Sequence, residues 1–121
     1  MKIAVIAHDG TKDRLRRFIQ SKMDLISNLT IVYTRGTSKI FKELILDIIA
    51  VESGPLGGDA QIAAQIVSNK IEAVLFLRNP LGKHPQEPDI NMLLRLCDVY
   101  KVPLATNFKT AEILLNHFKN I

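Results

Sequence analysis

The chain has 121 residues and one cysteine, Cys97, so its length suits a single domain spanning residues 1–121 and allows no internal disulfide. A hydrophobic content of 47% and a mean hydropathy of +0.12 argue against disorder, and no apolar run reaches the roughly 18 residues of a membrane helix. The net charge of +4 suits an anionic partner, but 6% aromatic residues without tryptophan provide little for stacking on bases. We therefore expect a small phosphorylated metabolite rather than nucleic acid or a membrane as the partner.

The first half of the chain alternates apolar runs with helical periodicity. Lys2–Ala7 is rich in β-branched residues and predicts a buried strand. The apolar run is too short for a signal peptide and is followed at once by polar residues, so we expect a cytoplasmic protein. A helix is expected at Thr11–Ser27, with Thr11 as its N-cap. A strand at Leu29–Thr34, a helix at Thr37–Leu46 and a strand at Ile48–Glu52 follow.

The second half continues the alternation. The segment Asn79–Pro88 holds three of the five prolines, which predicts an irregular loop. Cys97 lies in an apolar helical pattern and is expected to be a buried, inert thiol. The other predicted elements are a helix at Asp59–Asn69, a strand at Glu72–Leu77, a helix at Asp89–Tyr100, a strand at Val102–Ala105 and a helix at Lys109–Phe118.

Strict alternation of strands and helices predicts a three-layer α/β fold of the Rossmann or flavodoxin-like type, with a five-stranded, mostly parallel sheet between helices. Ligands of such sheets bind beyond the carboxyl ends of the strands. Polar groups follow each predicted strand and should share that edge: His8-Asp9, Gly36-Thr37-Ser38, Ser53 to Asp59, Asn79, and Thr106-Asn107.

The turn from Ser53 to Asp59, with the sequence Ser-Gly-Pro-Leu-Gly-Gly-Asp, joins a predicted strand to a predicted helix. The pair Gly57-Gly58 lets the backbone approach a ligand, and the N–H groups of the new helix favour an anion. A carboxylate repels an anion, so Asp59 makes sense there if it acts chemically on the rest of the ligand. The alternative is that Asp59 only caps the helix, a position that aspartate favours.

Four blocks in order resemble the methylglyoxal synthase family and span nearly the whole chain. They are Met1 to Asp9, Ser53 to Ile62, Glu87 to Asp89 with Leu93 to Asp98, and Val102 to Asn107. The resemblance implies the methylglyoxal synthase-like fold and a carbon–oxygen lyase that converts dihydroxyacetone phosphate to methylglyoxal and phosphate. It also implies a homo-oligomer, a hexamer, that needs no cofactor or metal.

The resemblance implies roles for the candidate site residues. Asp59 would be the base, with partial burial and like-charge repulsion from Asp9 and Asp89 raising its pKa. His8 would polarise the substrate carbonyl or hold Asp9. The expected phosphate and substrate contacts are Lys12, Thr37, Ser38, Ser53, Gly54, Gly57, Gly58, Asn79 and Gln86.

Plainer alternatives stay open for these residues. His8 and Asp9 could only turn the chain, and Lys12 could be a surface lysine. The others could be helix caps or turn residues, namely Thr37, Ser38, Asp89, Thr106 and Asn107.

Several positions depart from the family pattern. Asn79 stands where the family has aspartate, and Gln86 replaces the histidine of its Pro-His-Glu-Pro-Asp motif, with His84 two residues too early. Arg35 and Lys39 replace a threonine and a glycine, and could either strengthen anion binding or fill the phosphate cradle. The departures imply impaired or altered chemistry. They leave open a non-catalytic phosphometabolite-binding domain, like the similar allosteric domain of carbamoyl phosphate synthetase.

Overall fold

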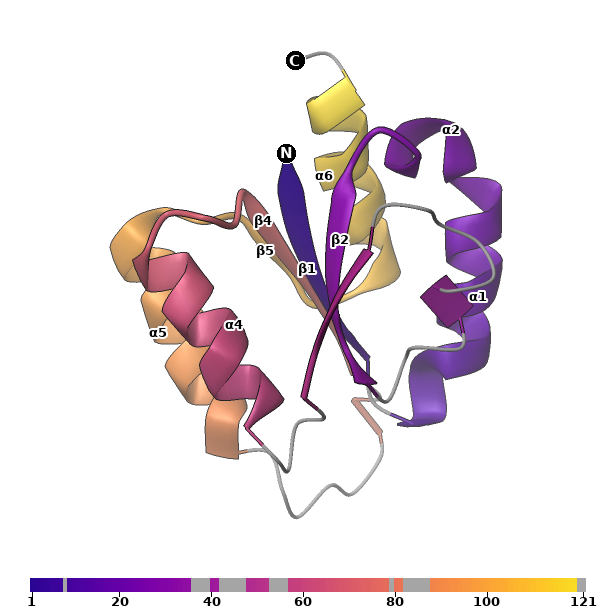
Figure 1. Ribbon diagram of the computed structural model, residues 1–121. Coiled ribbons are helices and arrows are strands. Elements are labelled where there is room, and N and C mark those ends of the chain that lie inside the picture. Colours follow the sequence, from indigo (N-terminus) through magenta and orange to yellow (C-terminus); the bar gives the residue numbers. More distant parts are fainter. Residues whose placement is uncertain are drawn as a thin grey trace.

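A five-stranded parallel sheet forms the centre of the molecule, with strand order β3-β2-β1-β4-β5 (Figure 1). The computed structural model describes residues 1–7, 9–35, 40–41, 48–52, 57–78, 80–81 and 88–119. Within them the strands are β1 (Lys2–Ala7), β2 (Thr30–Thr34), β3 (Ile48–Val51), β4 (Ala73–Leu77) and β5 (Leu104–Ala105). All the strand pairs are parallel, which confirms the predicted sheet.

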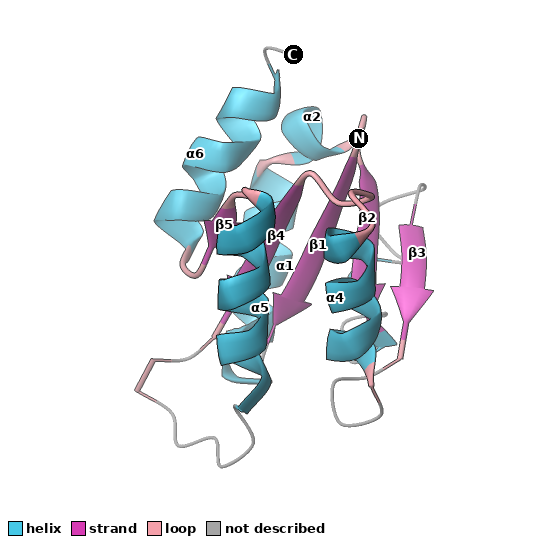
Figure 2. Cartoon of the chain, turned by 90° about the vertical axis from the view of Figure 1, so that its left-hand side faces the viewer, coloured by secondary structure: helices cyan, strands magenta, loops and turns pink. Residues whose placement is uncertain are grey.

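Helices cover both faces of this sheet, as Figures 1 and 2 show. Helices α1, α2 and α6 pack on one face, and α4 and α5 pack on the other. Their bounds are α1 (Lys12–Ser21), α2 (Met23–Ile26), α4 (Gly58–Val67), α5 (Pro88–Tyr100) and α6 (Phe108–Lys119), with a short 3-10 helix η1 (Asp9–Thr11) before α1. The three-layer α/β fold is therefore confirmed.

Alternating side chains of each central strand supply the two cores. In β1, Ile3 and Val5 face the core beneath α1 and α6, whereas Ala4 and Ile6 face the core beneath α4 and α5. Successive side chains of a strand point to opposite faces, so a strand covered on both sides must be apolar throughout. This explains why Lys2–Ala7 is a continuous apolar run after its first residue.

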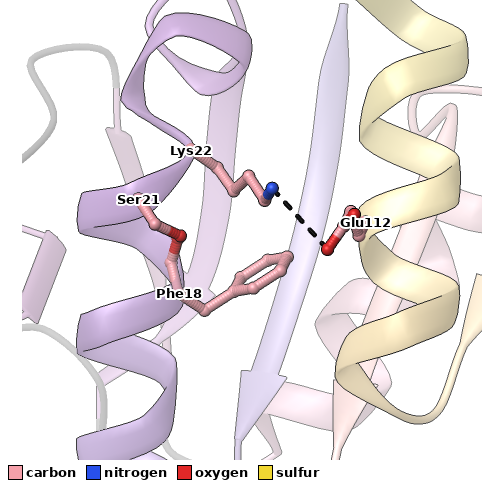
Figure 3. Close-up of polar contacts among 4 residues, drawn as sticks. All are labelled: Phe18, Ser21, Lys22 and Glu112. Carbon is pink, nitrogen blue, oxygen red and sulfur yellow. Dashed lines mark hydrogen bonds and ion pairs between the residues drawn. The ribbon is translucent and has the colours of Figure 1, made fainter.

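Polar and aromatic contacts join the α1 region to α6, and Figure 3 shows the ion pair between Lys22 and Glu112. Lys22 Nζ lies 3.6 Å from Glu112 Oε2. The Phe18 and Phe108 rings have their centroids 5.3 Å apart, and the Arg14 guanidinium lies 4.7 Å from the centre of the Phe108 ring. These contacts hold the start of α6 against α1.

The predicted helix Thr11–Ser27 is divided in the structure. Lys22, with φ −119° and ψ 19°, leaves the helical conformation, and α2 begins at the next residue. The break allows Leu25 and Ile26 to enter the core. Most of the predicted helix Thr37–Leu46 lies outside the described residues, although Ile40 and Phe41 are helical and buried.

Candidate functional site

The carboxyl ends of all the strands meet at one edge of the sheet, because every pair is parallel. The last rungs of the ladders pair Ala7 with Leu77 and Thr34 with Val51. The described residues that follow these rungs, Arg78, Arg35 and Glu52, therefore lie along the same edge. This edge is where ligands of open parallel sheets bind.

Part of the predicted site lies within the described residues. Asp59, Lys12, Gly57 and Gly58 are described, and the backbones of Asp9 and Asp89 are placed in η1 and α5. The predictions for the remaining positions fall outside the described residues, namely for His8, Thr37, Ser38, Ser53, Gly54, Asn79 and Gln86, and likewise for Lys39 and His84.

Asp59 is the second residue of α4 and is half-buried. Gly57 occupies the N-cap position of this helix, so the alternative that Asp59 is the N-cap is wrong. The chain enters the helix through Gly57, whose φ of +101° lies in the left-handed region that favours glycine. A Cβ on Gly57 would meet nothing within 4 Å, so its conformation rather than crowding requires glycine. The first turn of α4 also favours the negative charge of Asp59.

Thr11 links the first turn of α1 to the end of β4. Its hydroxyl donates a buried hydrogen bond of 3.1 Å to the Leu77 carbonyl oxygen. Thr11 occupies the N-cap position of α1, as predicted, although its side chain makes no capping hydrogen bond. Lys12, the first residue of α1, is half-buried and lies beside this link. Strand order reverses between β1 and β4, which places Lys12 at the topological switch point.

Helix capping was also an alternative for Asp89 and Asn107, and of these two only Asn107 caps a helix. Helix α5 begins at Pro88, so Asp89 is its second residue rather than its N-cap. Proline suits the first helical position because its missing N–H has no helical partner there. Asn107 does cap α6, because its Oδ1 accepts the N–H of Thr110 at 3.0 Å and the hydroxyl of Thr110 at 3.2 Å.

A hollow of about 280 Å³ opens at the ends of β4 and β5. Its lining consists of Arg14, Leu77, Arg78, Pro80, Thr106, Asn107 and Phe108. Among the predicted site positions that the structure describes, Thr106 and Asn107 line it, whereas Lys12 and Asp59 do not. Arg14 and Arg78 were not predicted to belong to the site, although the position of Arg78 directly after β4 is a signal in the sequence.

Arg35 pairs with Glu52 at the ends of β2 and β3. Arg35 Nε lies 3.0 Å from Glu52 Oε1, and the side chains are 63% and 40% exposed. The backbone N–H of Glu52 also donates to Gln61 Oε1 at 2.7 Å, which links β3 to α4. Neither Glu52 nor Gln61 was predicted to belong to the site. Their signal in the sequence is only position: Glu52 follows β3, and Gln61 stands two residues after Asp59.

Cys97 is buried on α5, as predicted. Burial, together with the negative charge of Asp98, raises the pKa of its thiol to about 11, so it stays protonated near neutral pH. Over the described ranges, no three histidine, cysteine or acidic side chains are grouped so that they could hold a metal ion. None of the helices in that part of the chain is long and apolar enough to cross a membrane.

The sequence matches known proteins over nearly its full length. The family model for the MGS-like domain matches residues 18–106. The methylglyoxal synthase of Borrelia garinii subsp. bavariensis is 46% identical over an alignment of 121 positions, which covers 99% of this chain and 96% of that protein. The chain belongs to the methylglyoxal synthase family. The methylglyoxal synthase of Bacillus subtilis is 50% identical over 117 residues, 95% of this chain and 85% of that one.

A solved structure supports the same methylglyoxal synthase assignment at the level of the fold. The crystal structure of methylglyoxal synthase from Elizabethkingia anophelis superimposes with a TM-score of 0.86 at 35% sequence identity. The match covers 94% of this chain and 76% of that one. The resemblance drawn from the four sequence blocks is thereby confirmed.

Proposed function

We propose that this chain is a methylglyoxal synthase that eliminates phosphate from dihydroxyacetone phosphate. The observation that carries the proposal is Asp59, a half-buried carboxylate in the first turn of α4 at the ligand-binding edge of the sheet. It ends the Ser-Gly-Pro-Leu-Gly-Gly-Asp block of a chain 46% and 50% identical to methylglyoxal synthases.

The proposed reaction needs one base and one anion site. Asp59 removes a proton from the hydroxyl-bearing carbon next to the carbonyl, and the electron pair forms an enediolate. The hydroxyl of the enediolate then gives up its proton, which the departing phosphate takes, and its oxygen forms the aldehyde carbonyl. The carbon–carbon double bond shifts toward the other carbon and expels phosphate by breaking the carbon–oxygen bond there. The resulting enolate takes up a proton on its terminal carbon to become methylglyoxal. Asp9, Asp89 and His8 support the proton transfer.

The departing phosphate needs a cation and fixed hydrogen-bond donors. Lys12, half-buried at the switch point, is proposed as the cation. The proposed donors and substrate contacts are Thr37, Ser38, Ser53, Gly54, Gly57, Gly58, Asn79 and Gln86. Because Asn79 and Gln86 depart from the family pattern, we propose a turnover slower than that of a family member with aspartate and histidine there.

The broader properties of the protein are part of the same proposal. We propose a single domain over residues 1–121, a homo-oligomer, a cytoplasmic location, and a reaction without metal or organic cofactor. The hexamer is proposed from the family resemblance alone. A small phosphorylated substrate and inorganic phosphate are the proposed ligands.

The direct test is a methylglyoxal assay on the purified protein, with phosphate release measured in parallel. We expect the two products in equal amounts from dihydroxyacetone phosphate, and an unchanged rate after treatment with a chelator, because no metal takes part. Phosphate-ester binding without either product would contradict the lyase and identify a phosphometabolite-binding domain.

Inorganic phosphate should stabilise the protein, because a ligand that binds only the folded state raises the free energy of unfolding. At roughly 100 times its Kd the gain is about 2.7 kcal/mol, measurable as a higher Tm. Lys12→Ala should reduce the phosphate-dependent shift. Lys70→Ala is the matched control, since Lys70 is an exposed lysine between α4 and β4, away from the carboxyl edge. An equal loss of the shift in both variants would remove Lys12 from the anion site.

A further inference from the structure

Strands β2 and β3 are joined by side chains just beyond the point where their backbone pairing ends. Thr34 and Val51 form the last rung between β2 and β3. The next residue on each strand is Arg35 or Glu52, and their side chains pair at 3.0 Å. The ion pair therefore extends the β2–β3 ladder one step further toward the carboxyl edge.

A second link continues from β3 to the helix that carries the proposed base. The N–H of Glu52, the residue after the last rung, donates to Gln61 Oε1 at 2.7 Å. Gln61 is one turn from the start of α4, and its own N–H donates to the Gly57 carbonyl oxygen at 3.1 Å. Glu52 thus connects the first turn of α4, with Asp59, to the ends of both strands.

We propose that Arg35, Glu52 and Gln61 act as a clamp that positions the anion site and Asp59 relative to each other. The three are positioning residues, since they act through the segments they join. In sequence, Glu52 precedes the block Ser53 to Asp59, and Gln61 follows it. This inference rests on the proposed function, because the clamp matters only if this edge binds a phosphorylated ligand.

The clamp also explains how arginine is accommodated at position 35, where the family has threonine. Arg35 gives its Nε to a carboxylate beside it, so its charge is offset locally. An exposed pair of this kind adds little to global stability. Its effect is local, because small displacements of binding groups are costly in binding and catalysis.

The test compares phosphate affinity in two single variants whose charge changes are opposite. If the clamp positions the site, Arg35→Ala and Glu52→Ala should both raise the Kd of inorganic phosphate, by roughly threefold to tenfold. If Arg35 is instead a phosphate ligand, only Arg35→Ala weakens binding, and Glu52→Ala tightens it by removing a negative charge. Opposite signs, or no change in either variant, overturn the clamp.

Charge reversal and a second ion pair supply the controls. The double variant Arg35→Glu with Glu52→Arg rebuilds the pair at unchanged net charge and should restore most of the affinity. Lys22→Ala and Glu112→Ala break the pair of Figure 3, with the same two charge changes, at the far end of α1 from Lys12. They should leave the Kd unchanged. Failure of the double variant to recover any affinity contradicts the proposal.

Gln61 is tested by turnover as well as affinity. Gln61→Leu removes the acceptor for the Glu52 N–H and should lower kcat on dihydroxyacetone phosphate by roughly tenfold while Tm changes little. An unchanged kcat and Kd in this variant remove Gln61 from the clamp. If the parent protein binds phosphate but makes no methylglyoxal, the proposed lyase activity is refuted. The clamp is still tested in that case by the phosphate affinities of the variants. A parent that binds no phosphate overturns the clamp.

Discussion

Asp59→Asn should reduce methylglyoxal formation by roughly 100-fold to 10,000-fold, the range that loss of a general base produces. Asparagine keeps the shape of the side chain but cannot accept the proton from the substrate carbon. The same change removes a negative charge from the proposed anion site, so phosphate-ester binding should stay intact or become tighter. The measurement is kcat from methylglyoxal formation, with the Kd of inorganic phosphate on the same sample.

Asp13→Asn is a matched control for this experiment. Asp13 is also an acidic residue in the first turn of a helix at the carboxyl edge, but it is exposed on α1 and has no proposed role. Its replacement should change kcat by less than about twofold, because surface substitutions of this kind have small effects. A variant of Asp59 that keeps most of its activity would exclude Asp59 as the base.

Gln86→His together with Asn79→Asp should raise the rate on dihydroxyacetone phosphate by roughly tenfold or more, because both changes restore the family pattern. A histidine can donate to the oxygen that gains charge only in the transition state, and it can exchange a proton near neutral pH, which glutamine cannot. Gln86→His alone should give the larger share. The two sites lie seven residues apart in the chain, and the gains should not be additive.

A third substitution makes this test specific. In an Asp59→Asn background the double variant should show no gain, because the restored electrophile needs the base. If the double variant is no faster than the parent, phosphate-ester affinity separates the explanations. Tight binding with fast turnover means that the parent already has another arrangement, and tight binding without turnover means that the protein is a binder.

The sequence alone determined the layers of this fold. A strand covered on both faces must be apolar along its length, and a helix packed on one side must repeat its apolar residues every three to four positions, so both patterns are local and readable. Two elements show the result. Strand β1 has the predicted bounds Lys2–Ala7, and helix α4 differs from the predicted helix Asp59–Asn69 only at its ends. The edge of the sheet at which the site is proposed followed from the parallel strands.

Local signals failed where a residue had a distant partner. Thr11 has the side chain of a good N-cap, yet its hydroxyl binds Leu77, 66 residues away. Lys22 interrupts a helix that periodicity continues, because Leu25 and Ile26 then reach the core. Nothing in the neighbouring residues records these contacts, since they depend on which elements lie side by side.

The link between Arg35 and Glu52 shows the same division at the site. The sequence placed Arg35 at the carboxyl edge but left open whether it strengthens anion binding or fills the cradle. Strand order decided its partner, because β2 and β3 are neighbours and their last rung brings the following residues together. Composition and periodicity describe each element separately, whereas ion pairs and hydrogen bonds between elements arise only when the tertiary structure sets the elements in register.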